Sequence, residues 1–177
     1  FLTVLTHAQT IPVGQWGGDE LLRVKQLTGQ LDAAQSLTAR PFFNTVLPDT
    51  LAILPASISV KFNSHHPYGW NDAGMIMAKG LQTAFSAGVY AKAGPLSIQL
   101  MPEFYFAANS SYATTVGYGS HTGKSFQKIY PGQSAIRLHL GPVSIGASTE
   151  NLWWGPGQFS SLMMSNNAPG FQHLSFN

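Results

Sequence analysis

The sequence contains no cysteine and few charged residues. The lack of cysteine excludes a disulfide-stabilised scaffold and a cysteine-based metal site. Charged residues make up only 9% of the chain, whereas about 25% is usual for globular proteins. The basic residues are scattered along the chain. The sequence therefore lacks the basic stripe that is typical of a nucleic-acid-binding protein, and we expect no nucleic-acid partner.

Long apolar runs are absent as well. No stretch approaches the ~18 consecutive apolar residues of a membrane-spanning helix, although 44% of the residues are hydrophobic. Glycine, serine, threonine, asparagine and glutamine replace the missing charges. This composition is typical of a transmembrane β-barrel, in which one face of each strand contacts lipid and the other faces a wet lumen. Soluble all-β sandwiches have a similar pattern but usually contain more charged residues.

The first fifty residues differ from the rest. Residues 1–8 are predicted to be the end of a secretory signal peptide, with Thr6 and Ala8 at positions −3 and −1 of the cleavage site. We therefore expect an exported protein, of which this chain is the N-terminal part. Residues 9–50 are predicted to form a periplasmic segment of helical and extended structure. Within it, Asp19 is suited to cap a helix over residues 20–30.

Alternation of apolar and polar residues dominates residues 51–177 and predicts about six strands. We expect them over residues 52–63, 74–92, 96–106, 136–140 and 143–152, with a sixth beginning near Phe171. In the first strand, Leu54, Ile58 and Phe62 should share one face. Residues 110–132 are expected to form a long loop.

The predicted connections alternate in length. Short turns at residues 94–95 and 141–142 separate long loops at residues 64–73, 110–132 and 153–170. Outer-membrane barrels have short periplasmic turns and long extracellular loops. The predicted fold class is therefore all-β, as part of an antiparallel up-and-down transmembrane β-barrel with a short N-terminal helix.

Two glutamates occupy equivalent positions in the short hairpins. Glu103 and Glu150 each lie eight residues after the proline of a Gly-Pro turn. At ~3.3 Å per residue and ~40° of tilt, both carboxylates should lie roughly 20 Å from the turns, on the inner face and near the outer mouth. They are candidates for binding sugar hydroxyls. The alternative is a structural pairing with Arg137.

Catalysis is not expected from these residues. Two carboxylates about 5–9 Å apart can hydrolyse glycosides, but the sequence does not determine the separation of Glu103 and Glu150. No Ser-His-acid arrangement stands out either. His65, His66 and Asp72 match no standard zinc spacing, so an ordinary polar loop, without metal or cofactor, is expected there.

Residues 150–169 combine aromatic, glycine and amide residues after a strand. Tryptophan offers a flat apolar surface to a sugar ring, and amides hydrogen-bond hydroxyl groups. If alternation continues, Trp153 faces lipid and Trp154 faces the lumen, which makes Trp154 the better candidate. The alternatives are an aromatic girdle for the tryptophans and turn formation for Asn166 and Asn167. The inward-facing Arg137 would either attract an acidic polysaccharide or pair with Glu150.

Several of these motifs resemble those of the Wzi-type capsule-assembly outer-membrane proteins. The resemblance rests on residues 150–157 (ENLWWGPG), 160–162 (SSL) and 165–169 (SNNAP), on 66–69 (HPYG) with 71–72 (ND), on 79–82 (KGLQ), and on 102–103 (PE) with Asn109. The segment from the Trp-Gly-Pro-Gly motif to the Asn-Asn-Ala-Pro motif is the most specific part.

The resemblance implies a monomeric barrel of about eighteen strands with a periplasmic helical element, of which this chain would supply about six strands. It also implies an outer-membrane lectin that holds capsular or other surface polysaccharide and is surrounded by outer-membrane lipid. The alternative function is an outer-membrane porin or specific channel. The candidate polysaccharide-binding residues are Glu103, Tyr105, Asn109, Arg137, Glu150, Asn151, Trp154, Ser161, Asn166 and Asn167.

Overall fold

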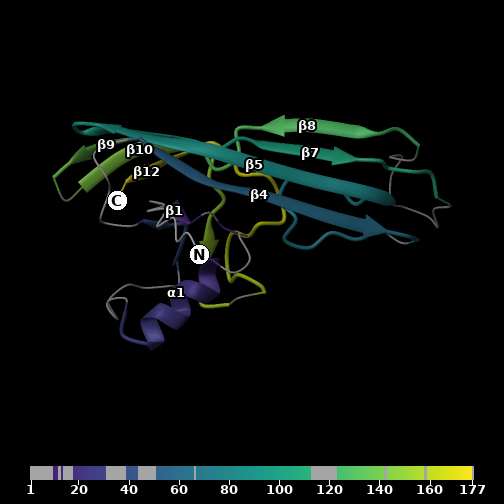
Figure 1. The fold of residues 1–177 in the computed structure, drawn as a ribbon, viewed down its shortest axis with the longest axis horizontal. Helices are drawn as coiled ribbons and strands as arrows, with labels where there is room; N and C mark the ends of the chain where they lie inside the picture. The colour runs from purple at the N-terminus through teal and green to yellow at the C-terminus, as the bar shows by residue number, and fades with distance from the viewer. Residues whose placement is uncertain are drawn as a thin grey trace, which may run out of the picture.

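A computed structural model describes residues 10–11, 13, 18–30, 39–43, 51–65, 67–112, 123–141, 143–157 and 159–176. Its main feature is one antiparallel eight-stranded sheet, which is long and open (Figure 1). The predicted signal-peptide remnant, residues 1–8, lies outside the described part of the chain.

The chain forms one short helix and twelve strands in the described residues. They are β1 (Thr10–Ile11), α1 (Gly18–Leu27), β2 (Ala39–Arg40), β3 (Phe42–Phe43), β4 (Ala52–Asn63), β5 (Gly80–Ala93), β6 (Leu96–Leu100), β7 (Glu103–Ala107), β8 (Phe126–Tyr130), β9 (Ala135–Leu140), β10 (Val143–Ser148), β11 (Trp153–Trp154) and β12 (His173–Phe176).

The large sheet is an up-and-down meander. Strand β5 pairs with β4 on one side, and with β6 and β7 on the other. Strands β6 and β7 are successive parts of one line, interrupted at Met101 and Pro102, as expected from the missing N–H of proline. Strands β9 and β8 continue the sheet beside β6 and β7, and β10 and β12 follow β9. The all-β, antiparallel, up-and-down prediction is confirmed, and the sheet is not closed.

Three predicted strand boundaries are wrong. Residues 126–130, placed in a loop, form β8 because their backbone pairs with the free edge of β7. The second strand begins at Gly80 rather than Gly74, since the backbone of the preceding segment bonds elsewhere: the Met75 N–H donates to the carbonyl of Asp72 (3.0 Å). Strand β10 ends at Ser148, because the N–H groups that follow turn to side chains: the Glu150 N–H donates to Ser148 Oγ (3.0 Å) and the Asn151 N–H donates to Gln133 Oε1 (3.0 Å).

The two faces of the sheet differ as the alternation predicts. Along β5, Gln82, Ser86 and Tyr90 are buried, whereas Leu81, Phe85 and Val89 are exposed. We call the buried side the inner face and the exposed apolar side the outer face. Strands β6, β7 and β9 repeat the pattern.

Leu54 is an exception to the predicted alternation. A register shift between Leu54 and Ser57 places both on the inner face, where they pair with Gly88 and Ser86. Leu54 is therefore buried, in a small apolar cluster with Tyr90 and Met101, whereas Ile58 and Phe62 are exposed on the outer face. The expectation that Leu54 shares a face with Ile58 is wrong because a β-bulge reverses the phase.

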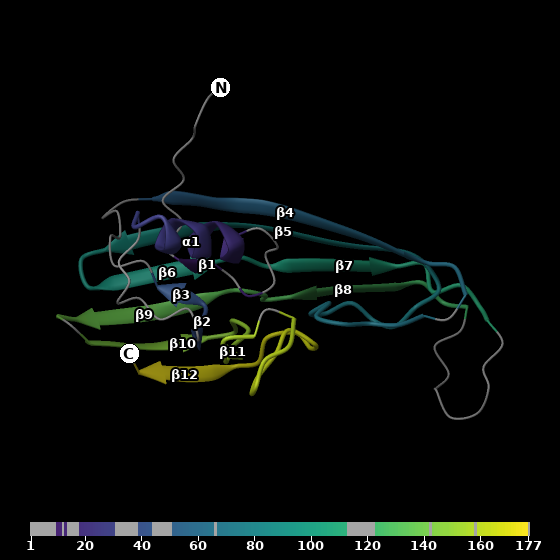
Figure 2. The ribbon, with the colours of Figure 1, turned by 90° about the horizontal axis from the view of Figure 1, so that it is seen from below.

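The N-terminal elements lie beneath one face of the sheet (Figures 1 and 2). Helix α1 spans residues close to the predicted range of 20–30. Strand β2 pairs with β11, and β1 pairs with β3. In the described part of the chain, no helix combines the length and apolar character needed to cross a membrane.

Candidate functional site

A buried ion pair lies on the inner face. Glu150 follows β10 and pairs with Arg137 of β9, and both side chains are almost completely buried. Glu150 also accepts hydrogen bonds from Ser148 Oγ (2.7 Å) and Gln99 Nε2 (3.3 Å). Of the two alternatives for Arg137, the pairing with Glu150 is the one found. The guanidinium is therefore engaged inside the protein rather than presented to an acidic polysaccharide.

The second glutamate belongs to an adjoining hydrogen-bond network. Glu103 accepts hydrogen bonds from Tyr105 Oη (2.7 Å) and Gln133 Nε2 (2.9 Å). Gln133 Nε2 also donates to Asn151 Oδ1 (2.8 Å), and the Asn151 N–H donates to Gln133 Oε1 (3.0 Å). Gln99 Nε2 donates to the Gln133 carbonyl (2.7 Å), which connects this network to Glu150.

The interruption between β8 and β9 makes this network possible. Gly132 lies between β8 and β9 with a φ of +61°, a conformation that glycine adopts without strain. A Cβ at this position would lie 2.5 Å from the Met101 carbonyl and 2.6 Å from Glu103 Cγ. The absence of a side chain therefore lets the chain pass close to Glu103 and carry Gln133 into the interior.

The position of the two carboxylates differs from the prediction. Glu103 pairs with Ser86, near the middle of β5. The network that joins Glu103 to Glu150 therefore lies near the middle of the sheet, not at its outer end. The number of residues between each turn and its glutamate is as predicted. The sheet, however, extends beyond Glu103 through β7 and β8, so Glu103 does not lie at its end.

Asn166 and Asn167 hold two loops together. The Asn71 N–H donates to Asn167 Oδ1 (2.6 Å), and Asn166 Nδ2 donates to the carbonyl of Asn71 (3.2 Å). Asn71 Nδ2 in turn donates to the carbonyl of Phe159 (2.9 Å). The amides therefore connect the segment before β5 with the segment after β11.

The environment of Trp153 differs from the prediction. Trp153 is buried beneath the sheet, with the Arg40 guanidinium 5.1 Å from its ring centroid and its Nε1 donating to the Gly157 carbonyl (3.0 Å). Trp154 is 43% exposed. The prediction that Trp153 faces outward fails because β11 leaves the sheet and pairs with β2, so the alternation of β10 does not continue.

Two predicted residues lie away from the network. Asn109 is buried at the end of β7, where its Nδ2 donates to the Lys124 carbonyl (3.0 Å) and closes the connection toward β8. Ser161 is partly exposed in the segment after β11. The structure thus brings together Glu103, Tyr105, Arg137, Glu150 and Asn151, and it separates them from Asn109, Trp154 and Ser161.

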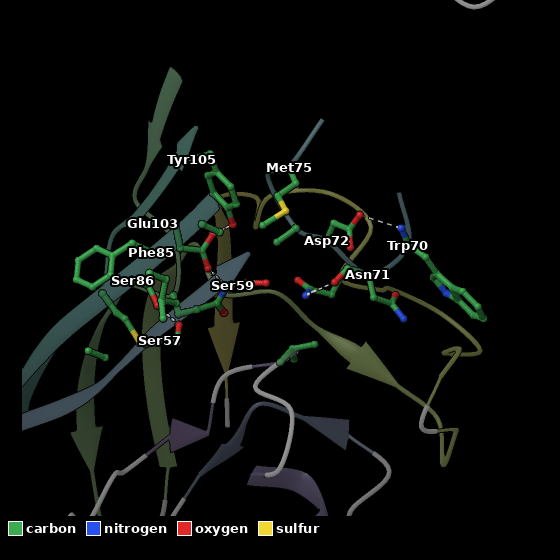
Figure 3. A pocket seen from close by; sticks show the side chains of 18 residues that line it. Ser57, Ser59, Trp70, Asn71, Asp72, Met75, Phe85, Ser86, Glu103 and Tyr105 are labelled. Atoms are coloured by element: carbon green, nitrogen blue, oxygen red, sulfur yellow. Dashed lines mark hydrogen bonds between the residues drawn. The ribbon is translucent and has the colours of Figure 1, made fainter. Parts of the chain in front are cut away.

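A pocket opens beside Glu103 on the inner face (Figure 3). It has a volume of about 460 Å³. In the figure, Ser57, Ser59, Ser86, Glu103 and Tyr105 lie on the sheet side, and Trp70, Asn71 and Asp72 lie across from them. The Ser57 and Ser86 hydroxyls share a hydrogen bond of 2.7 Å.

Several of these residues were not among the predicted site residues. The inward position of Ser57 and Ser59 follows from alternation, but the approach of residues 70–75 depends on loop contacts between distant segments. Gln133, which links the two glutamates together with Gln99, was missed for the same reason, whereas the inward position of Gln99 on β6 follows from alternation. The sequence signal that could have identified these residues is the presence of polar residues at inward positions of the strands beside Glu103.

The described residues contain no cluster of three or more side chains suited to hold a metal ion. Asp72 instead forms a salt bridge with Lys61 (2.5 Å). His66, part of the loop considered for metal binding, lies outside the described residues.

Most of this chain matches one known protein family. The family model for capsule assembly protein Wzi matches residues 55–177, which is more than half of the chain. The chain belongs to the Wzi family. The matched region includes all eight strands of the large sheet except the first residues of β4. No curated protein and no solved structure matches the chain significantly.

Proposed function

We propose that this protein is an outer-membrane, lectin-like barrel protein that binds capsular or other surface polysaccharide and helps to attach or assemble the capsule at the cell surface. The observation that carries the proposal is the match of the Wzi capsule assembly model to residues 55–177. The polar inner face and the exposed apolar outer face support a sheet that contacts lipid on one side only. We propose no enzymatic activity.

The outer face supports the membrane part of the proposal. Phe85 and Phe104 lie on neighbouring strands with ring centroids 6.1 Å apart, and both are exposed. Leu100, Ile136 and Ile145 continue this exposed apolar surface on β6, β9 and β10. Because soluble proteins rarely expose such extended apolar patches, contact with lipid is the environment that fits this face.

A gene deletion tests the proposal. In a capsulated cell that carries the gene, we expect deletion to leave total polysaccharide unchanged while moving polysaccharide from the cell-bound fraction into the medium. Both fractions are measured by uronic-acid and neutral-sugar assays of washed cells and supernatant. An unchanged distribution would contradict a role in capsule attachment.

Complementation of the deletion strain with variants of the gene tests the role of a single residue, Trp154. The exposed Trp154 is the candidate aromatic surface, so we expect Trp154→Ala to restore less cell-bound polysaccharide than the unmodified protein. Leu162→Ala is a matched control, because Leu162 is an exposed apolar residue of the same segment. Equal retention by the two variants would exclude Trp154 as a binding residue.

The alternative function, a porin or specific channel, predicts ion conductance. The packing of α1, β1, β2, β3 and β11 beneath the sheet supports an obstructed interior (Figure 2). We therefore expect the protein to show no stable conductance in planar lipid bilayers. Reproducible single-channel steps would favour the channel function instead.

A further inference from the structure

We propose that the pocket beside Glu103 binds an uncharged sugar residue and selects it over an acidic one. This inference rests on the proposed function, because the ligand would be one unit of a surface polysaccharide. It goes beyond that function by assigning a separate site and a chemical class of ligand. Neither Ser59 nor Asp72, which line this pocket, belongs to the network that joins Glu103 to Glu150.

The pocket has an excess of hydrogen-bond acceptors. An ionised carboxylate has about four lone-pair positions, and Glu103 receives two hydrogen bonds from described residues, from Tyr105 and Gln133. Asn71 and Asn166 also line the pocket, and the buried Oδ1 atom of each has no hydrogen-bond partner among the described residues. Since an unsatisfied buried acceptor is costly, the lining favours a ligand that donates several hydrogen bonds.

Sugar hydroxyls meet this requirement better than other neutral groups. Each hydroxyl both donates and accepts, so it suits a wall that combines carboxylates with serine hydroxyls. Ser59 lies on β4 beside the hydrogen-bonded pair of Ser57 and Ser86. Met75 and Val13 add apolar lining, which suits the C–H surface of a sugar ring.

The charges around the pocket disfavour an acidic ligand. Among the described residues, its lining includes the carboxylates of Asp72 and Glu103 but no lysine, arginine or histidine. Lys61 contacts the pocket-lining Asp72, but its ammonium group is bound to Asp72 and to the Tyr68 carbonyl (2.5 Å each). A uronic acid, phosphate or sulfate group would therefore enter without a partner of opposite charge, which is unfavourable in a partly desolvated site.

The size of the pocket fits a small part of a glycan chain. Ligand pockets usually have volumes of ~300–1,000 Å³, and this one has about 460 Å³. Trp70 lies at its rim with 59% of its surface exposed. In Figure 3 its ring extends away from Ser57, Ser59 and Ser86. The pocket is thus open to solvent on the side of Trp70, where the remainder of a polysaccharide can leave.

Direct titration tests the proposal. The protein expressed from the complete gene is purified in detergent micelles and titrated with neutral disaccharides of hexose, 6-deoxyhexose and N-acetylhexosamine units, and separately with digalacturonic acid. Binding is measured by saturation-transfer NMR and calorimetry. We expect at least one neutral disaccharide to bind and digalacturonic acid to bind about tenfold more weakly or not at all. Equal or tighter binding of the acidic disaccharide, or no binding of any neutral one, would overturn the proposal.

A charge inserted into the pocket provides a second test. We expect Ser59→Arg to weaken binding of the neutral disaccharide about tenfold and to strengthen binding of digalacturonic acid, because the new guanidinium fills the pocket and pairs with a carboxylate. Ser160→Arg introduces the same charge at an exposed position outside the pocket and should leave both affinities unchanged. If both variants behave alike, the binding site lies elsewhere.

The two proposals fail in different ways. If the neutral disaccharide binds as described but gene deletion does not release polysaccharide, the capsule role is wrong and the pocket assignment stands. If deletion releases polysaccharide but Ser59→Arg has no effect on disaccharide binding, the capsule role stands and the pocket assignment is wrong.

Discussion

At the scale of single residues, the interior of this protein is stabilised by polar contacts. Gln82 and Gln99 are among the most deeply buried side chains, and the apolar cluster of Leu54, Tyr90 and Met101 is small. Hydrogen bonds within such an interior are strong when every group has a partner, but loss of one partner is costly. Substitutions in the network should therefore affect stability before they affect binding.

The buried ion pair provides the first prediction. We expect Arg137→Met to lower the free energy of unfolding by about 3–5 kcal/mol, because it leaves the Glu150 carboxylate buried without its cation. Urea unfolding of the protein expressed from the complete gene, in detergent and followed by tryptophan fluorescence, measures the change. Lys124→Met, at an exposed lysine, is the control. The double variant Arg137→Met with Glu150→Leu should recover most of the loss, and no recovery would contradict this explanation.

The tryptophan pair provides the second prediction. Trp153 is buried against Arg40 and Trp154 is half exposed. We expect Trp153→Ala to cost about 3–5 kcal/mol of stability, as is usual for a buried aromatic residue, and Trp154→Ala to cost less than about 1 kcal/mol. The same urea titration distinguishes them. A larger loss for Trp154→Ala would reverse the assignment of the buried ring.

At the scale of elements, the interruptions in the strands carry the candidate site. The break between β6 and β7 and the facing break between β8 and β9 bring Gln133 next to Glu103. Uninterrupted strands would continue the ladder of backbone hydrogen bonds but would leave no room for this side chain. Local irregularity in the sheet thus positions the polar network.

A matched pair of glycines tests this role. Gly132 and Gly141 both have positive φ, at +61° and +68°, but only Gly132 has neighbours where a Cβ would lie. We expect Gly141→Ala to cost about 1 kcal/mol, from backbone strain alone. Gly132→Ala should cost about 1–3 kcal/mol more, because its Cβ would clash with the Met101 carbonyl. Equal losses in urea unfolding would show that the close approach is unimportant.

At the scale of the whole molecule, the sheet has two open edges. Among the described residues, β4 pairs only with β5, and β12 pairs only with β10. Exposed apolar residues lie on both edge strands, including Ile58 on β4 and Leu174 on β12. Unpaired backbone groups are strongly unfavourable in lipid and promote aggregation in water.

This arrangement predicts the behaviour of the isolated chain. We expect residues 1–177, refolded alone into lipid vesicles, not to give a stable, membrane-inserted monomer. Protease protection and sedimentation velocity in detergent report insertion and association. A protease-resistant, inserted monomer would contradict the prediction and would mean that the edges are satisfied by residues outside the described part of the chain.

Much of the architecture was predictable because sheet alternation is a local property. The outward positions of Phe104 and Phe106, and the inward positions of Glu103 and Arg137, follow from counting residues along a strand. Leu54 was misplaced because one bulge reverses the phase of everything before it. Pro55, which lies within the register shift and has no backbone N–H to donate to a regular ladder, was the available signal for this bulge.

The sequence by itself determined the strand-rich fold, the two different faces of the sheet and the membership of the Wzi family. These depend on residue types and their spacing. Only the tertiary structure decided that Arg137 pairs with Glu150, that Trp153 is the buried tryptophan, and that residues 70–75 face Glu103 across a pocket. The physical reason is that these contacts join segments far apart in the chain, whose approach depends on packing and on hydrogen bonds between loops.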